Sequence, residues 1–452
     1  MVYEFKHKDM LFSTDGSFDE VLALDRYVVS EYENFSEGDT VVFPSAYDED
    51  YNAKQVGVLT EVDGVTAKAL DRKGRTHEIE LEVTSKALET EPHQLWSRWS
   101  KGASSVEKTD KQKEVENDFR WLFDGFRFSP GGRIQISLGQ EHVTGERAPL
   151  TAYNCFVIPS PEAREGDLDQ FLEVLAKAEL EASIMRRGGG VGLNIGNINT
   201  VNGIGKDIDF GVTLRKDHRD HDEYLERIEK GKFKGVKTDH INKRKSSKNH
   251  LVIVPHDSVD GLFASLNDLV KEAYTGEWDS IVLNFSDLRH RNALVKGING
   301  QSSGSVSWAE LYVLVINLLK QDKIDNVDFA EIYSTITNLI EQGGSRRGAL
   351  MIVNNIENET IDKFISRKKT PGYLEGANIS TGISDGFMQN IKANKADSSL
   401  YQIEASRWKN IIESAWSSAE PGIVWLERYN KESNSWYFND IEATNPCGTP
   451  NP

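Results

Sequence analysis

Cysteine is scarce in this sequence: Cys155 and Cys447 are the two among 452 residues. Two cysteines cannot build a disulfide scaffold or a four-cysteine zinc site. The ten histidines are scattered, so the sequence predicts no metal site. The most apolar run, Leu311 to Leu319, has about nine residues, whereas a membrane span needs ~20. Because the charged N-terminus also lacks a secretory signal, we expect a cytoplasmic protein without membrane contact.

Positive charge is also under-represented. Lys and Arg number 53 against 71 Asp and Glu, which gives a net charge of −18. Since phosphate binding needs excess cation, this balance argues against a nucleic-acid partner. One stretch, Lys230 to Lys248, holds eight basic residues and a single acid, Asp239. It is either a solvated surface or a contact with nucleotide phosphates or nucleic acid.

The first third of the chain is predicted to contain two parts. Residues 1–92 read as a small β-rich domain, because β-branched or alternating runs at 39–43, 56–62 and 76–82 are separated by Gly-containing turns. A five-stranded barrel would fit this length. Residues 93–148 read as a helical segment, in which Pro130, Gly131 and Gly132 interrupt the helical pattern.

From residue 149 to 452, long helical patterns alternate with short apolar strands. Helices are expected at 167–185, 328–341 and 400–418, and Ser307 with Glu310 forms a capping-box pattern that predicts a helix through Leu319. Strands are expected at 191–195, 251–254, 280–285, 349–353 and 422–426. This alternation predicts an α/β fold with a parallel sheet, open or closed into a barrel. Residues 200–290 read as an insertion.

Two glycine-rich stretches could carry function. Gly188 to Gly190 joins a helix to a strand, the reverse of the order in a dinucleotide-binding fingerprint. It allows either close backbone approach or a simple helix cap. The stretch from Gln342 to Ala349 contains Arg346 and Arg347, which suit phosphate or base recognition, although a solvated surface turn explains it equally well.

The cysteines occupy different local contexts. Asn445-Pro446-Cys447-Gly448 presents a cysteine on a tight loop, because Pro fixes φ and Gly frees the following residue. That placement favours a nucleophile, a ligand or a radical carrier over core packing. Cys155 begins an apolar strand, where burial alone would explain it.

Taken together, these stretches resemble one family, the ribonucleotide reductase large subunits, and in particular the monomeric adenosylcobalamin-dependent (class II) ribonucleoside-triphosphate reductases. The resemblance covers about residues 120 to 448, in the order found in the family. The motifs are Phe128-Ser-Pro-Gly-Gly-Arg133, Tyr153-Asn-Cys155, Gly188-Gly-Gly-Val-Gly192, Gln342-Gly-Gly-Ser-Arg-Arg-Gly348, Gly376-Ala-Asn-Ile-Ser380, Pro421-Gly-Ile-Val424 and Ala443-Thr-Asn-Pro-Cys-Gly448.

The resemblance implies the first half of a ten-stranded α/β barrel and a thiyl-radical reduction of ribonucleotides to 2′-deoxyribonucleotides. Cys447 would carry the radical on a finger loop, Cys155 would be half of the reducing dithiol, and Asn445 would orient the substrate. Gly132, Asn154 and Gly190 would line the substrate site. The effector and specificity residues would be Asp167, Leu168, Gln342, Gly343, Gly344, Ser345, Arg346 and Arg347.

The same resemblance implies the binding partners. The cofactor would be adenosylcobalamin, the substrate a ribonucleoside tri- or diphosphate, the effector a dNTP or ATP, and the reductant thioredoxin-like. The family usually has Glu where this sequence has Thr449, and its second redox cysteine follows the finger loop. We therefore expect an N-terminal portion that needs the C-terminal remainder of the reductase. A class I large subunit and a non-catalytic nucleotide-binding relic remain alternatives.

Overall fold

The computed structural model describes residue 24 and residues 27–44, 54–71, 73–146, 150–238, 249–295, 300–342, 346–393 and 398–448. The chain divides into two compact units. The first comprises residues 1–154, 292–302 and 342–346, and the second comprises residues 155–291, 303–341 and 347–452. These boundaries follow contacts in space, whereas the domain limits expected at 92 and 148 stay predictions from the sequence.

An antiparallel sheet forms the β part of the first unit. Six strands pair in the order β1-β6-β2-β3-β4-β5. They are β1 (Ser30–Glu31), β2 (Thr40–Pro44), β3 (Lys54–Asp63), β4 (Thr66–Asp71), β5 (Thr76–Glu80) and β6 (Ser85–Ala87). The expectation of five strands was wrong, because β1 and β6 have only two and three residues and cannot display a period-two pattern. The core of this sheet is formed by buried side chains that include Val41, Phe43, Leu59 and Ala69.

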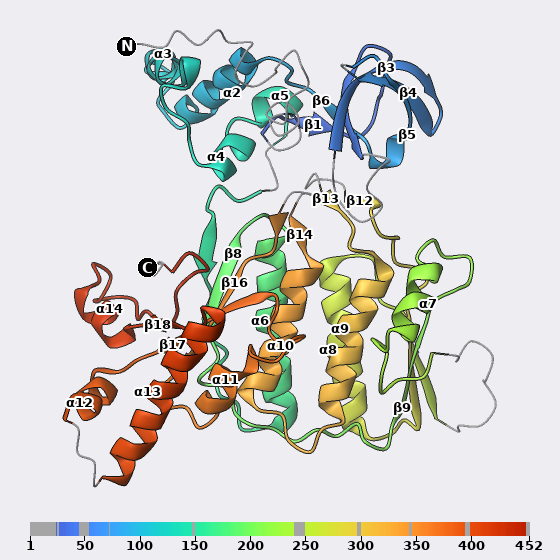
Figure 1. Ribbon diagram of the computed structural model, residues 1–452. Helices are drawn as coiled ribbons and strands as arrows, with labels where there is room; N and C mark the ends of the chain where they lie inside the picture. Colours follow the sequence, from blue (N-terminus) through green and yellow to red (C-terminus); the bar gives the residue numbers. More distant parts are fainter. Residues whose placement is uncertain are drawn as a thin grey trace. The chain divides into compact units, whose positions relative to one another are not determined.

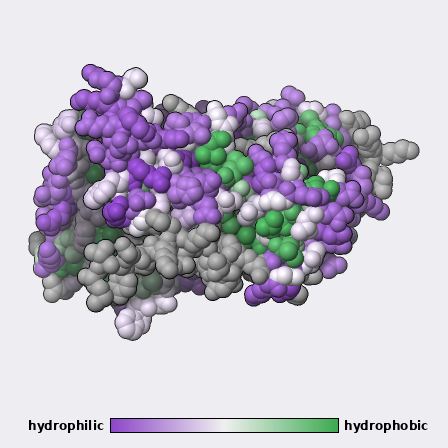
Figure 2. Space-filling view, turned by 90° about the horizontal axis from the view of Figure 1, so that it is seen from above, coloured by the Kyte–Doolittle hydropathy of each residue, from purple (hydrophilic) through white to green (hydrophobic). Residues whose placement is uncertain are grey.

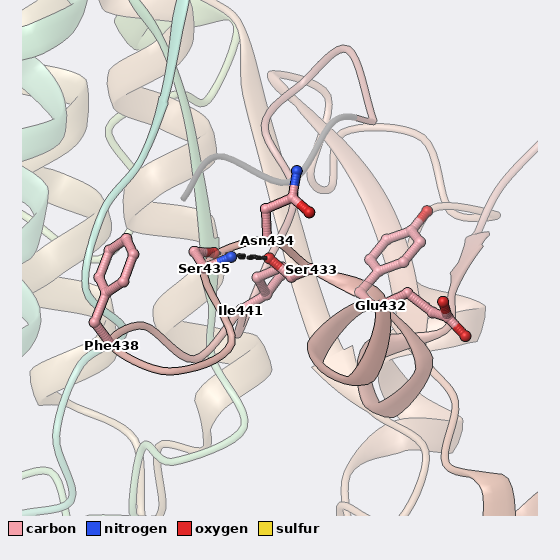
Figure 3. Close-up of a pocket in the computed structure, with 7 residues that line it drawn as sticks. Glu432, Ser433, Asn434, Ser435, Phe438 and Ile441 are labelled. Atoms are coloured by element: carbon pink, nitrogen blue, oxygen red, sulfur yellow. Dashed lines mark hydrogen bonds between the residues drawn. The ribbon is translucent and has the colours of Figure 1, made fainter.

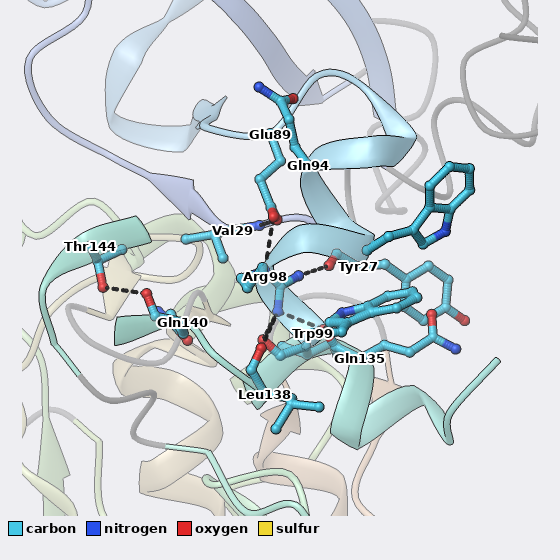
Figure 4. Close-up of polar contacts among 12 residues, drawn as sticks. Tyr27, Val29, Glu89, Gln94, Arg98, Trp99, Gln135, Leu138, Gln140 and Thr144 are labelled. Carbon is cyan, nitrogen blue, oxygen red and sulfur yellow. Dashed lines mark hydrogen bonds and ion pairs between the residues drawn. The ribbon is translucent and has the colours of Figure 1, made fainter. Parts of the chain in front are cut away.

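The first unit also contains several helices. They are α2 (Pro92–Ser104), α3 (Gln112–Phe123), α4 (Gly132–Ser137) and α5 (Glu141–Thr144), with 3-10 turns η2 (Leu81–Val83) and η3 (Asp124–Phe126). Arg98 of α2 is buried and pairs with the buried Glu89 at 2.9 Å. As Figure 4 shows, Arg98 also donates to the carbonyl oxygens of Leu138 and Tyr27. Because Arg98 also binds these carbonyl oxygens, the buried ion pair connects α2 to the segments around residues 27 and 138.

A parallel sheet forms the centre of the second unit. Its five strands pair in the order β18-β17-β16-β8-β7. They are β7 (Cys155–Val157), β8 (Gly190–Asn194), β16 (Leu350–Asn355), β17 (Ala377–Gly382) and β18 (Gly422–Val424). The predicted parallel α/β arrangement is confirmed. The strands expected at 251–254 and 280–285 belong to a separate parallel sheet, β10 (His250–Ile253), β11 (Ser280–Asn284) and β9 (Asp209–Thr213).

Long helices pack against these sheets, and Figure 1 shows α6 (Asp167–Met185) and α10 (Asn326–Leu339) side by side. Phe171 of α6 meets Phe329 of α10 edge to face in the main core. The other helices are α7 (His221–Glu229), α8 (Val259–Thr275), α9 (Gly304–Leu319), α11 (Ile361–Arg367), α12 (Asp385–Ala393), α13 (Ser399–Ser418) and α14 (Leu426–Glu432). Short strand pairs are β12 (Leu294–Val295) with β13 (Gly300–Gln301), and β14 (Glu341–Gln342) with β15 (Arg346–Arg347).

The start of α9 differs from the prediction. The helix begins at Gly304, so the expected capping residues Ser307 and Glu310 lie inside it. Its first turn is capped by a distant residue instead: the Asp220 carboxylate accepts hydrogen bonds from the Ser305 N–H at 2.9 Å and from the Ser305 hydroxyl at 2.8 Å. A tertiary cap supplied from 85 residues away overrides the local pattern.

The surface in Figure 2 is largely hydrophilic, as expected for a chain with many charged residues. Figure 2 shows hydrophilic residues over much of one face, interrupted by hydrophobic patches. Among the residues that the structure describes, no helix combines the length and apolar character needed to cross a bilayer. Across the same residues, no group of three or more His, Cys, Asp or Glu is arranged to hold a metal ion.

Candidate active site at the Cys155–Cys447 pair

The two cysteines of the chain lie next to each other. Their sulfur atoms are 3.7 Å apart, although 292 residues separate them in the sequence. Cys155 is the first residue of β7 and is half-buried, whereas Cys447 is exposed on the loop that follows residue 444. The sequence predicted a functional Cys447, but on local pattern alone it gave Cys155 an inert, buried role. The fold instead makes a thiol pair.

Strand β8 explains how the loop reaches Cys155. Its sequence Gly-Val-Gly-Leu-Asn alternates small and large residues, and successive side chains of a strand point to opposite faces. Val191 and Leu193 pack in the main core beneath the helices. Gly190 and Gly192 lie on the other face, in register with Cys155 and Val157 of β7. That face therefore carries almost no side-chain bulk.

The segment from Glu442 to Pro446 runs over the small face of β8, in the direction opposite to the strand. Asn194 donates a 2.8 Å hydrogen bond to the Glu442 carbonyl oxygen. A Cβ placed on Gly192 would overlap the Thr444 carbonyl oxygen, and one on Gly190 would lie 3.2 Å from Pro446 Cγ and 3.1 Å from Cys155 Sγ. Gly192 is thus required for this close approach of backbone to backbone, and a side chain at Gly190 would crowd Cys155 and Pro446.

The loop tip is held by its own asparagine. The Asn445 side chain is 4% exposed, and its Oδ1 accepts a 2.9 Å hydrogen bond from the Cys447 N–H. The Asn445 carbonyl oxygen accepts another, also 2.9 Å, from the Gly448 N–H, and Gly448 has a φ of +78°. These contacts fix the backbone on both sides of the Cys447 sulfur and leave the sulfur itself exposed.

A second asparagine anchors the base of the segment. Asn430 of α14 donates to the Ile441 carbonyl oxygen at 3.0 Å and accepts from the Ile441 N–H at 2.6 Å. Beyond it, Ala443 packs with Met351 and Val353 of β16. Sequence reasoning missed Asn194 and Asn430, because nothing in their local pattern shows which distant backbone groups they bind.

The glycines at 188–190 have separate roles. Gly188, with a φ of +91°, follows the end of α6, as the helix-cap interpretation requires. A Cβ on Gly189 would lie 2.8 Å from the Phe156 ring, and Gly190 faces Cys155. Both interpretations of the motif therefore apply, each to a different glycine.

The remaining predicted site residues are dispersed over other elements. Gly132 starts α4, and the exposed Asn154 directly precedes β7; both belong to the first unit. Asp167 starts α6 and accepts a hydrogen bond from the Asn202 N–H at 3.2 Å. Leu168 packs at the edge of the main core.

The predicted specificity loop coincides with the β14–β15 pair. Gln342 ends β14, while Arg346 and Arg347 form β15. Gly343, Gly344 and Ser345 lie outside the described residues, as do Thr449 and Lys243 to Lys248 in the basic stretch. The effector and specificity roles of these residues stay predictions.

A cavity of about 480 Å³ adjoins the base of the segment (Figure 3). Its lining residues are Tyr429, Glu432, Ser433, Asn434, Ser435, Phe438 and Ile441. Three neighbouring aromatic residues, Trp436, Tyr437 and Phe438, are each about two-thirds exposed and contact one another edge to face. This aromatic run in a polar stretch was a signal that the sequence analysis did not use.

Part of the chain is similar to a known protein family. Residues 251–407 match the family model for the ribonucleotide reductase barrel domain. This part of the chain is therefore similar to a ribonucleotide reductase barrel domain, and the predicted resemblance and α/β fold class are confirmed.

Its relatives include enzymes that depend on vitamin B12. The chain is 29% identical over 202 residues to a vitamin B12-dependent ribonucleoside-diphosphate reductase of Thermoplasma acidophilum, with 42% of this chain and 23% of the relative covered. It is 22% identical over 364 residues to an adenosylcobalamin-dependent ribonucleoside-triphosphate reductase of Lactobacillus acidophilus, with 74% and 45% covered. The chain thus spans less than half the length of these relatives.

The fold is also similar to that of a solved structure. The crystal structure of a B12-dependent (class II) ribonucleotide reductase matches with a TM-score of 0.56 and 17% sequence identity, covering 78% of this chain and 50% of that one. At this identity the match establishes the fold.

Proposed function

We propose that this chain, together with the part of its relatives that it does not span, reduces ribonucleotides to 2′-deoxyribonucleotides by a thiyl-radical mechanism. The observation that carries the proposal is the 3.7 Å approach of two thiols from a strand of the parallel sheet and a loop packed over that sheet. One exposed sulfur that meets a substrate and a second sulfur beside it suit hydrogen abstraction followed by reduction.

Adenosylcobalamin is the proposed cofactor, and when bound it supplies the initiating radical. The exposed Cys447 sulfur fits this role, because a group arriving from outside can reach it. Cys447, as a thiyl radical, would take the 3′ hydrogen of the ribose, which allows the 2′-hydroxyl to leave as water. Asn445 would hold the loop and orient the ribose hydroxyls. Cys155 would be one half of a dithiol, with a cysteine beyond the finger loop as the other half. This dithiol would reduce the substrate radical and end as a disulfide, which a thioredoxin-like dithiol would reduce again.

Other residues would bind nucleotides. Gly190, which has no side chain, would leave room for the ribose and phosphates, and the family resemblance gives Gly132 and Asn154 roles in substrate binding as well. Asp167, Leu168 and the segment from Gln342 to Arg347 would carry the response to a dNTP or ATP effector. For the substrate we propose a ribonucleoside triphosphate, because the triphosphate reductase of Lactobacillus acidophilus aligns with 74% of this chain and the diphosphate reductase of Thermoplasma acidophilum with 42%.

In the test, this chain is combined with the portion of a class II ribonucleotide reductase that it does not span. With adenosylcobalamin and a dithiol, the complex should convert CTP to dCTP faster than CDP to dCDP. Cys447→Ser should lower the rate roughly 10³-fold or more, since the hydrogen-abstracting sulfur is lost. Gly386→Ala, at an exposed position of α12, is the matched control and should leave it unchanged. Equal rates in Cys447→Ser and the unaltered chain would contradict the proposal.

A further inference from the structure

The Cys155–Cys447 pair has a second chemical use besides turnover. The mechanism implied by the family resemblance pairs Cys155 with a cysteine beyond the finger loop, whereas the sulfur that this structure places next to Cys155 is that of Cys447, 3.7 Å away. Both belong to the second unit, and no other cysteine occurs in the sequence.

The geometry permits a covalent bond between these sulfurs. A disulfide needs an S–S distance of about 2.05 Å, so the sulfurs must approach by roughly 1.7 Å. Cys447 sits at an exposed loop tip, and Gly448 after it has the conformational freedom to absorb that movement. Gly190 adds no side chain between Cys155 and Pro446, so nothing on β8 blocks the path.

We propose that Cys155 and Cys447 form an intrachain disulfide when the chain meets a low-molecular-weight disulfide such as glutathione disulfide. The exposed Cys447 thiolate attacks one sulfur of that disulfide and releases one thiolate. The Cys155 thiolate then attacks the Cys447 sulfur and releases the second. In total, two protein thiols lose two electrons and two protons, and one small disulfide becomes two thiols.

The bond would act as a reversible block. If the proposed function holds, oxidised Cys447 has no S–H bond from which a thiyl radical can form, so the chain would be inactive until a dithiol reduces it. The same class of reductant that serves turnover would therefore also reset the enzyme. Formation of the bond itself requires no cofactor, substrate or C-terminal portion.

The experiment exposes the whole chain to glutathione disulfide and maps its peptides without reduction. We expect a peptide containing residues 155 and 447 joined, a mass lower by about 2 Da, and no titratable thiol, all reversed by dithiothreitol. In Cys155→Ser, Cys447 should instead keep a stable mixed disulfide with glutathione. Mixed disulfides on both cysteines of the unaltered chain, or disulfide-linked dimers, would overturn the proposal.

Two glycine variants test the geometry while keeping both cysteines. Gly192→Ala should slow the bond's formation at least about fivefold, because the new Cβ displaces Thr444 and the loop it leads to. Gly386→Ala meets nothing closer than 3.9 Å and should react like the unaltered chain. An unchanged rate in Gly192→Ala would contradict the role of β8. The experiment detects the disulfide itself. A lack of reductase activity would therefore contradict the proposed function and leave the proposed disulfide standing.

Discussion

At the scale of single residues, Asn445 shows how one side chain presents another. Its Oδ1 accepts from the Cys447 N–H, so Asn445→Ala should free that amide and loosen the loop tip. We expect the Cys447 amide to exchange its hydrogen roughly 5- to 30-fold faster, which corresponds to a lost cap of about 1–2 kcal/mol. Asn445→Asp, which keeps an acceptor oxygen, is the control. Equally fast exchange in both variants would show that the cap does not hold the loop.

The sequence predicted residues with strong local signals and missed those that act at a distance. Pro446 and Gly448 around Cys447 were sufficient to predict a cysteine presented on a tight loop, where the structure shows it exposed. Only the family resemblance placed Cys155 and Cys447 in one active site. It named a different cysteine, beyond the finger loop, as the disulfide partner of Cys155. Asn194 was missed because its partner, Glu442, lies 248 residues away, and no local pattern reports such a contact.

At the scale of elements, α9 provides a matched pair of substitutions. Asp220→Ala removes the acceptor for the Ser305 N–H and hydroxyl and for the Arg291 N–H at 2.9 Å. It should lower the free energy of unfolding by about 2 kcal/mol. Ser307→Ala, at the position that the local pattern favours, should change it by less than about 0.5 kcal/mol. Denaturant titration measures the free energy of unfolding of both variants. A larger loss in Ser307→Ala than in Asp220→Ala would show that the local pattern, and not Asp220, caps α9.

The contact between α6 and α10 contains a buried acid. Burial raises the pKa of Glu181 well above its usual range, and the hydrogen bond from the Thr337 hydroxyl offsets this only in part. The folded protein therefore keeps a proton that the unfolded chain loses near pH ~4.3, and stability should fall as pH rises above that value.

Glu181→Gln should weaken this pH dependence, because the amide does not titrate in this range. Denaturant midpoints at pH 5 and pH 7 test it, with Glu229→Gln at the exposed end of α7 as the control. A Glu181→Gln protein that loses as much stability between these two values as the unaltered chain would exclude a contribution from Glu181.

At the scale of the whole molecule, each unit has its own core, and the first depends on a buried ion pair. Arg98→Met leaves Glu89 charged and unpaired, so α2 should open with about 3–5 kcal/mol less protection, measured by hydrogen exchange. Adding Glu89→Leu should recover much of the loss. Lys113→Ala breaks an exposed pair with Glu116 and should cost under about 1 kcal/mol. A similar loss in both single variants would contradict a special role for the buried pair.

Short apolar runs between helical patterns predicted the parallel strands of the second unit well, because β8 and β16 are largely buried. They could not predict that residues 250–253 and 280–284 join a different sheet, since such a run does not identify a strand's neighbour. Nor could they predict how the chain divides into two units, because residues 292–302 return to the first unit through contacts remote in sequence.

The alternation in β8 also limits how this part of the gene can change. Inserting or deleting one codon between Gly190 and Asn194 would exchange the strand's two sides, turning bulky residues toward Thr444 and glycines toward the helices. Substituting Val191 by Ile leaves every side chain on its original face of the strand. Natural variants should therefore differ here in the identity of residues and keep their number constant.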